Sequence, residues 1–109
     1  MTVLLDDTPP PLPLDLAIRL AYELVTLAHP TRLRLLDAIR AGGVATRYEL
    51  ETALDLTDKE VWFQAYRLRK AGLIDGGGRG KPGVYRLTER GEQACELVAA
   101  WAAARGEGR

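Results

Sequence analysis

Residues 50–74, LETALDLTDKEVWFQAYRLRKAGLI, predict a short helix, a tight turn and a second helix that ends at a glycine. Thr57 is a good N-cap, and Glu60 three residues later completes a capping box, in which each side chain bonds a backbone N–H of the first turn. Gly72 suits the left-handed position at which many helices end. The second helix is therefore expected from about residue 58 to 71, in the arrangement of a helix-turn-helix.

This second helix has one narrow apolar face and an opposite face rich in cations and aromatic rings. At about 100° per residue, Val61, Ala65 and Leu68 line up, and we expect them to point into the domain. Clustered exposed rings indicate a binding surface. The candidate binding residues, with Trp62 at the flank, are Thr57, Lys59, Trp62, Phe63, Tyr66, Arg67 and Lys70.

Length and composition predict one cytoplasmic domain that does not enter a membrane. The chain has 109 residues, 47% of them hydrophobic, and no apolar run approaches the roughly 18 residues that a membrane helix needs. Its N-terminus has neither the basic start nor the apolar run of a signal peptide. A single cysteine excludes a disulfide within the chain.

The charges are unevenly distributed although the net charge is zero. Residues 59–90 contain eight basic and three acidic side chains, which leaves a local charge of +5 against −5 in the remainder. A basic face on a neutral body is typical of a protein that binds nucleic acid at selected sites. The alternative is that these are ordinary solvated surface charges.

The ends of the chain differ in composition from the middle. Residues 1–13 contain Pro9, Pro10, Pro11 and Pro13, so we expect a flexible proline-rich arm. Residues 14–104 form the predicted domain. The charged, glycine-containing residues 105–109 are expected to be a disordered tail.

The first and last predicted helices carry more apolar surface than one small domain can bury. In residues 14–28 the polar Arg19, Glu23 and Thr26 share one thin strip, and the remaining circumference is largely apolar. A last helix beginning after Thr88 has an apolar stripe that includes Trp101. We expect these helices to join two subunits through Ile18, Tyr22, Val25, Leu97 and Trp101. The alternative is that Trp101 closes the core of its own domain.

Between these helices the pattern completes a mainly α fold with a small β-hairpin. A helix follows His29-Pro30 and ends before two glycines, residues 44–45 suggest a short strand, and Thr46 with Glu49 forms another capping box. Strands at residues 73–74 and 84–87 flank a glycine-rich loop that carries Arg79 and Lys81. These elements predict a winged helix-turn-helix of about five helices and a wing sheet of two or three strands.

The residues that catalysis or metal binding would require are sparse. The chain has one histidine, His29, interpreted as a capping or packing residue, and one cysteine, Cys95, interpreted as a packing residue with a redox role left open. The literal G-x-G-x-x-G of residues 78–83 runs into a strand, whereas a dinucleotide fingerprint opens a helix. We therefore predict no enzyme, no catalytic residue, no cofactor and no metal site.

Four segments, LAHPTRLRLLDAI (27–39), YELETALDLTDKEV (48–61), LRKAGLI (68–74) and YRLTERG (85–91), resemble the winged helix-turn-helix transcriptional regulators of the broad ArsR- and MarR-like group of bacteria and archaea. The resemblance covers roughly residues 27–91. It implies a dimeric repressor or activator whose second motif helix enters the major groove, while the wing touches the adjacent backbone or minor groove. We expect Arg79 and Lys81 to make these wing contacts.

The sequence departs from this group in two places. The cysteine pair that metal-sensing ArsR-like proteins carry in the first motif helix is missing from residues 48–54, which argues against metal sensing. Trp62 and Phe63 stand where the group usually has small polar residues that read bases.

The expected function is a homodimeric, sequence-selective regulator bound to double-stranded DNA. The alternative is a protein-interaction module that uses the aromatic face for a protein partner and does not bind DNA.

Overall fold

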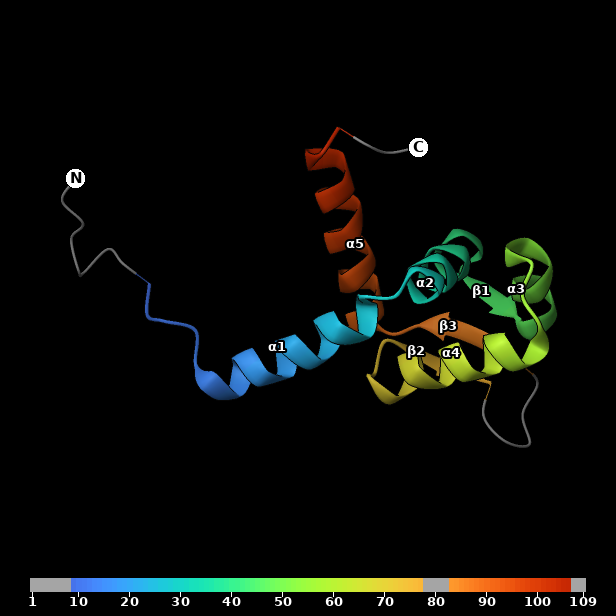
Figure 1. Cartoon of the computed structure of the whole chain (residues 1–109), viewed down its shortest axis with the longest axis horizontal. Helices are drawn as coiled ribbons and strands as arrows, with labels where there is room; N and C mark the ends of the chain where they lie inside the picture. Colours follow the sequence, from blue (N-terminus) through green and yellow to red (C-terminus); the bar gives the residue numbers. More distant parts are fainter. Residues whose placement is uncertain (1–8, 78–82, 107–109) are drawn as a thin grey trace.

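The computed structural model describes residues 9–77 and 83–106, which form a mainly helical winged helix-turn-helix domain (Figure 1). The helices and strands of the described residues are, in chain order, α1 (Leu14–Leu27), α2 (Pro30–Gly42), β1 (Val44–Thr46), α3 (Arg47–Leu54), α4 (Asp58–Lys70), β2 (Ile74–Gly76), β3 (Val84–Leu87) and α5 (Glu89–Ala104). The predicted fold class is confirmed.

The three strands form one antiparallel sheet in the order β1-β3-β2. The central strand β3 pairs with β1 through Ala45 and Tyr85, and with β2 through Asp75 and Arg86. Its partners come from opposite sides of the helix-turn-helix in the sequence. The sheet therefore ties the segment before α3 to the segment after α4.

The strand after α4 begins one residue later than the sequence analysis predicted. Leu73 lies outside β2 because its N–H bonds the Leu68 carbonyl at 3.0 Å, while the Gly72 N–H bonds the Arg69 carbonyl at 2.9 Å. With Gly72 at φ 79°, these bonds form the Schellman motif that ends many helices. The chain thus enters the wing in a fixed direction.

Both capping boxes predicted from the sequence are present. The Thr57 hydroxyl accepts from the Glu60 N–H at 3.1 Å, and the Glu60 carboxylate accepts from the Thr57 N–H at 2.9 Å; Thr46 caps α3 in the same way. Asp55 ends α3 in the left-handed region at φ 55°. These caps fix the turn between α3 and α4.

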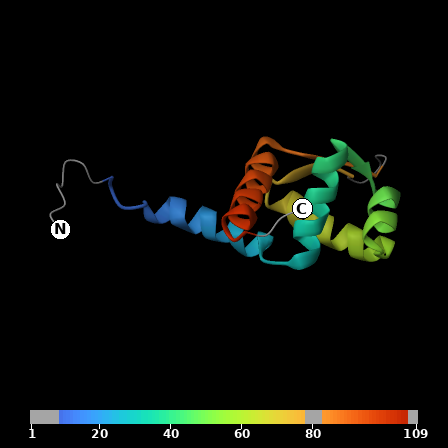
Figure 2. The ribbon, with the colours of Figure 1, turned by 90° about the horizontal axis from the view of Figure 1, so that it is seen from above.

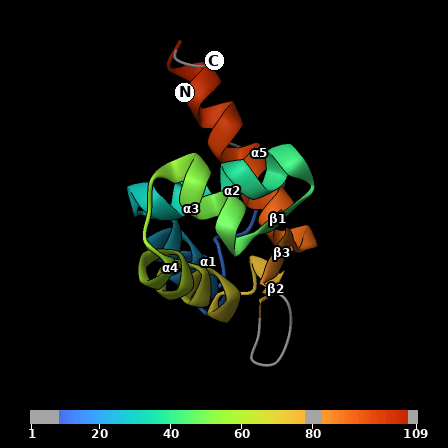
Figure 3. The same cartoon turned by 90° about the vertical axis from the view of Figure 1, so that its right-hand side faces the viewer.

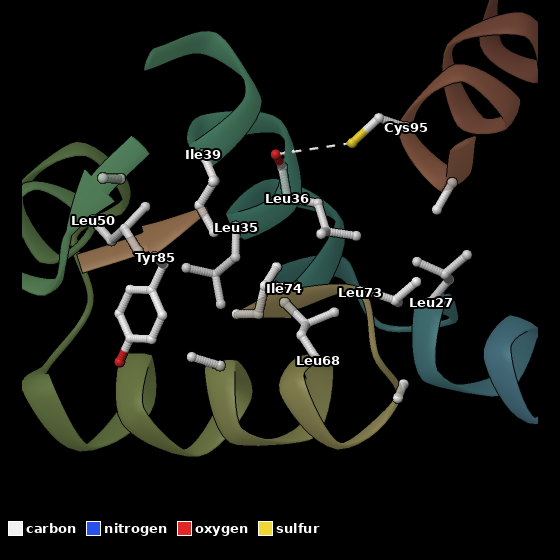
Figure 4. Packing of buried hydrophobic residues seen from close by; sticks show 14 of the residues in the cluster. Leu27, Leu35, Leu36, Ile39, Leu50, Leu68, Leu73, Ile74, Tyr85 and Cys95 are labelled. Carbon is white, nitrogen blue, oxygen red and sulfur yellow. Dashed lines mark hydrogen bonds between the residues drawn. The ribbon is translucent and has the colours of Figure 1, made fainter. Parts of the chain in front are cut away.

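A single core lies between α2, α4 and the sheet (Figure 4). Side chains from each of these elements point toward one another in that view. The largest fully buried side chains are Tyr85, Leu35, Ile39, Leu50, Leu68, Leu73, Ile74 and Val61. Burial of this set holds the helix-turn-helix against the sheet.

The first and last helices extend away from this core, as Figures 1 and 2 show. In α1 the residues turned toward the domain include the buried Thr26 and the half-buried Glu23, so part of the predicted polar strip faces inward. The apolar side chains Leu14, Ile18, Leu20, Tyr22, Leu24 and Val25 are exposed by 40–76%.

The last helix packs on α2 through Ala94 and Cys95, and its outer part carries exposed apolar groups. Leu97 is 51% exposed and Trp101 is 63% exposed. The alternative that Trp101 closes the core of its own domain is therefore wrong, because the side chain stands outside that core.

The two chain ends are described in part. Residues 9–13 have no regular secondary structure, and the arm's residues 1–8 lie outside the described ranges, as do 107–109 of the tail. Among the helices of the described ranges, none has both the length and the apolar character to cross a bilayer.

Candidate nucleic-acid interface

The solvent side of α4 forms a surface that we call the recognition face. Val61, Ala65 and Leu68 are buried on the inner side of the helix, as its apolar spacing predicts. In Figure 3, α4 lies beside α3 and near the wing strands, with its outer side open. The recognition face consists of the exposed residues Thr57, Lys59, Trp62, Phe63, Tyr66, Arg67 and Lys70.

The aromatic rings of the recognition face are held in place by neighbours on the same helix. Trp62, 51% exposed, stacks on Tyr66 with ring centroids 5.7 Å apart and planes 13° from parallel. The Arg67 guanidinium lies 5.3 Å from the centre of the Phe63 ring, and that of Arg69 lies 5.9 Å from the Tyr66 ring. Cation–π attraction of this kind orders both partners. The result is an apolar strip edged by positive charge.

The first turn of α3 adds two exposed side chains that the sequence analysis did not select. Arg47 lines a hollow together with Lys59, Trp62 and Phe63, and the neighbouring Tyr48 is 74% exposed. The signal was available, because the capping box at Thr46 places the next two residues in the first turn of α3. Arg47 extends the positive surface from α4 onto α3, although an ion pair with Glu51 at 3.3 Å offsets part of its charge.

The base of the wing is joined to both motif helices. The Arg47 N–H bonds the Gly83 carbonyl at 2.7 Å at the start of α3, and Arg69 Nη1 bonds the Gly76 carbonyl at 3.2 Å near the end of α4. Arg86 on β3 pairs with Asp75 at 3.7 Å. Arg79 and Lys81, the predicted contacts of the wing, lie outside the described residues.

The two residues considered for chemistry have structural roles. His29 caps α2, since its Nδ1 accepts from the Thr31 N–H at 3.2 Å. Cys95 is buried against α2, and this burial raises the pKa of its thiol above the ordinary value. The Arg40 charge acts in the opposite direction and is the smaller effect. Within residues 9–77 and 83–106, no three His, Cys, Asp or Glu side chains are placed to hold a metal ion.

No family model matches the sequence. The chain is 37% identical over 84 residues to a biofilm growth-associated repressor of Agrobacterium fabrum, a match that covers 77% of this chain and 69% of the relative. The transcriptional repressor BigR of Xylella fastidiosa has a similar structure, with a TM-score of 0.67 and 28% identity over 85% of this chain and 92% of the other. A winged helix-turn-helix DNA-binding domain of Mycobacterium bovis, described as homodimeric, gives a TM-score of 0.69 at 24% identity over 84% and 82%.

Proposed function

Because the chain belongs to the ArsR-like group of winged helix-turn-helix transcriptional regulators, we propose that it represses transcription as a homodimer bound to a roughly palindromic site in double-stranded DNA. The recognition face of each subunit lies in the major groove, and the wing contacts the adjacent backbone or minor groove. The observation that carries this proposal is the recognition face, whose cations surround an exposed apolar strip on the helix that the fold offers to a groove.

The charges on this side of the molecule support binding to a polyanion. Lys59, Arg67 and Lys70 on α4 and Arg47 on α3 are all exposed. Phosphate contacts from such side chains supply most of the sequence-independent affinity of DNA-binding proteins. We assign Arg79 and Lys81 of the wing to the same role. A repressor of this kind acts on the chromosome, so we place it in the cytoplasm.

The exposed apolar surfaces of α1 and α5 support the homodimer. They meet at a concave corner lined by Leu24, Leu27, Leu33, Val98 and Trp101, among others. Exposed apolar side chains that gather in this way mark an interaction site. We assign the dimer contact to Ile18, Tyr22, Val25, Leu97 and Trp101, all of which are exposed in the single subunit. The Mycobacterium bovis domain, with the same fold, is described as a homodimer.

A polarisation titration with random duplex DNA at low salt tests the proposal. The protein should bind, and its affinity should fall steeply as salt rises. Lys59→Ala and Lys70→Ala should each make the salt slope shallower by roughly one unit for every phosphate that the lysine no longer neutralises. Arg34→Ala is the control, because Arg34 is exposed on the α5 side of α2, away from the recognition face. Absence of binding to random and selected duplexes would refute the proposed function.

The alternative function is a protein-interaction module that uses the recognition face. The observation in its favour is the cluster of three exposed rings, Trp62, Phe63 and Tyr66, which is unusual for a helix that reads bases through hydrogen bonds. Under this alternative, substitutions in the cluster abolish binding of a protein partner, and the chain shows no salt-dependent affinity for DNA.

A further inference from the structure

We propose that Arg32 and Gln64 position α4 relative to the dimer helix α1, and that this link makes the protein selective for the spacing between two DNA half-sites. The inference rests on the proposed function and deepens it, because it assigns to two residues outside the recognition face a role in choosing the DNA site.

The link consists of hydrogen bonds that converge on Gln64. Arg32, in the first turn of α2, donates from Nε to Gln64 Oε1 at 2.8 Å and from Nη1 to the Thr26 carbonyl at 3.1 Å. The Gln64 amide nitrogen lies 3.4 Å from Nε2 of His29. One guanidinium thus joins the last turn of α1 to the middle of α4, and the α1–α2 junction holds Gln64 from two sides.

These bonds supply an orientation that the rest of the α4 contact does not. The inner side of α4 is otherwise apolar, through Val61, Ala65 and Leu68, and apolar burial has no preferred direction. Hydrogen bonds from a guanidinium have a fixed geometry and are stronger than neutral ones. Gln64 is therefore the polar contact at the middle of α4 that limits how far the helix can rotate about its axis or shift along it.

The other end of the link lies on the helix assigned to the dimer contact. Thr26 is buried, and its hydroxyl donates to the Tyr22 carbonyl at 2.9 Å, while Tyr22 and Val25 in the same turns are exposed on the side assigned to the dimer contact. The position that the partner imposes on α1 is thus transmitted through Arg32 to α4.

A second polar path joins α1 to the end of α4. Glu23 on α1 pairs with Arg90 on α5 at 3.5 Å, and Thr88, two residues before Arg90, donates to the Gly72 carbonyl at 2.6 Å. Two paths from one dimer helix fix both the middle and the end of α4. Each subunit then presents α4 at a set distance and angle from the dimer axis.

Such coupling has a consequence for the DNA site. Adding one base pair between half-sites moves the second half-site by ~3.4 Å and rotates it by roughly 34° about the duplex axis. A dimer with firmly held α4 helices cannot follow this change without breaking the Arg32–Gln64 bonds. A dimer without these bonds can follow it more easily, because only the path at the end of α4 still ties α4 to α1.

The experiment compares spacing selectivity in wild type and two variants at Gln64. The probes are duplexes carrying the half-site found by in vitro selection, with the preferred spacing or with one base pair added or removed, and a duplex with a single half-site. Wild type should bind the preferred spacing at least roughly 10-fold more tightly than the altered spacings, the scale of one broken hydrogen bond to a charged group. Gln64→Leu, similar in size but unable to accept a hydrogen bond, should reduce this ratio to about one-third or less of its value, while affinity for the single half-site stays unchanged.

Gln64→Glu is the matched rescue variant, because its carboxylate accepts from Arg32. It should keep the wild-type spacing ratio, with affinity lowered equally on all duplexes by the added negative charge. If thermal melting shows that Gln64→Leu is not folded, Arg32→Lys replaces it, since a single ammonium group cannot reproduce the two directed bonds of the guanidinium. Arg32→Lys should show the same loss of spacing selectivity. An unchanged spacing ratio in Gln64→Leu or Arg32→Lys overturns the inference and leaves the proposed function standing. Failure of wild type to bind any duplex refutes the proposed function itself.

Discussion

Replacing Phe63 with alanine should remove the preference for a T·A base pair at one position of each half-site. Phe63 lies near the centre of the recognition face, is 45% exposed and has no group that can hydrogen-bond. In the major groove its natural contact is the C5-methyl group of thymine. The cations around it are expected to supply affinity that does not depend on sequence, so binding to random duplex should change little.

The exposed fraction sets the size of the effect. A phenylalanine side chain buries about 150–250 Å² in total, so the exposed 45% offers roughly 90 Å² to a base. At ~25 cal/mol per Å² this limits the contribution of Phe63 to about 2 kcal/mol per subunit, or roughly 30-fold. Removing the thymine methyl alone costs about 0.8 kcal/mol, or roughly 4-fold, which a polarisation titration resolves.

The assay replaces each thymine of the selected half-site in turn by deoxyuridine, which lacks the methyl group but pairs identically. Wild type should lose affinity at one position, and Phe63→Ala should show no difference between thymine and uracil at that position. Tyr66→Phe is the control, because it removes a hydroxyl and keeps the ring. Equal binding by wild type and Phe63→Ala to every duplex would refute the placement of Phe63 in the groove. Loss of a protein partner in Phe63→Ala, with no DNA binding by either form, would support the interaction module instead.

Three further predictions concern assembly, stability and the thiol. Val25→Glu puts a charge in the proposed subunit contact, so sedimentation at micromolar concentration should show the 12.0 kDa monomer where wild type shows a dimer, and a dimeric variant would contradict that contact. Gly91→Ala should lower the free energy of urea unfolding by roughly 1–3 kcal/mol, because an added Cβ would clash with the Leu73 carbonyl oxygen; Gly42→Ala, which meets nothing within 4 Å, is the matched control, and equal losses in the two variants would contradict the steric argument. Burial raises the pKa of the Cys95 thiol in the folded state. The contribution of this thiol to the free energy of unfolding is therefore complete below the unfolded-state pKa of ~8.5, and it is lost as pH rises through the folded-state pKa. Urea unfolding at pH 7 to 10 should show this decline in the free energy of unfolding. In Cys95→Ala the part of the decline that begins near pH 8.5 should be missing, and an identical pH profile in the variant would contradict the prediction.

The features that the sequence predicted well depend on a few neighbouring residues. Both capping boxes and the helix end at Gly72 are local, because the groups that bond one another lie within five residues. The inner side of α4 followed from helical spacing in the same way. The recognition face could therefore be identified from the sequence alone.

The features that the sequence did not predict depend on contacts across long distances in the chain. Nothing in the pattern pairs Arg32 with Gln64, which are 32 residues apart. The orientation of α1 was predicted only in part: its exposed apolar side was expected, but the burial of its polar Thr26 was not. The start of β2 shifted because Leu73 is engaged by the end of α4, a competition between two elements for one N–H.

The order of strands in the sheet also bears on how the domain folds. Both motif helices lie within the stretch of chain between β1 and β3, so pairing these strands closes a loop of roughly 40 residues, at an entropic cost that grows only with the logarithm of its length. During synthesis, β3 emerges from the ribosome after α4. A nascent chain that ends before residue 84 thus has α3 and α4 without the central strand of the sheet. The sheet that flanks the two motif helices is thus completed by a strand that makes none of the proposed contacts with bases.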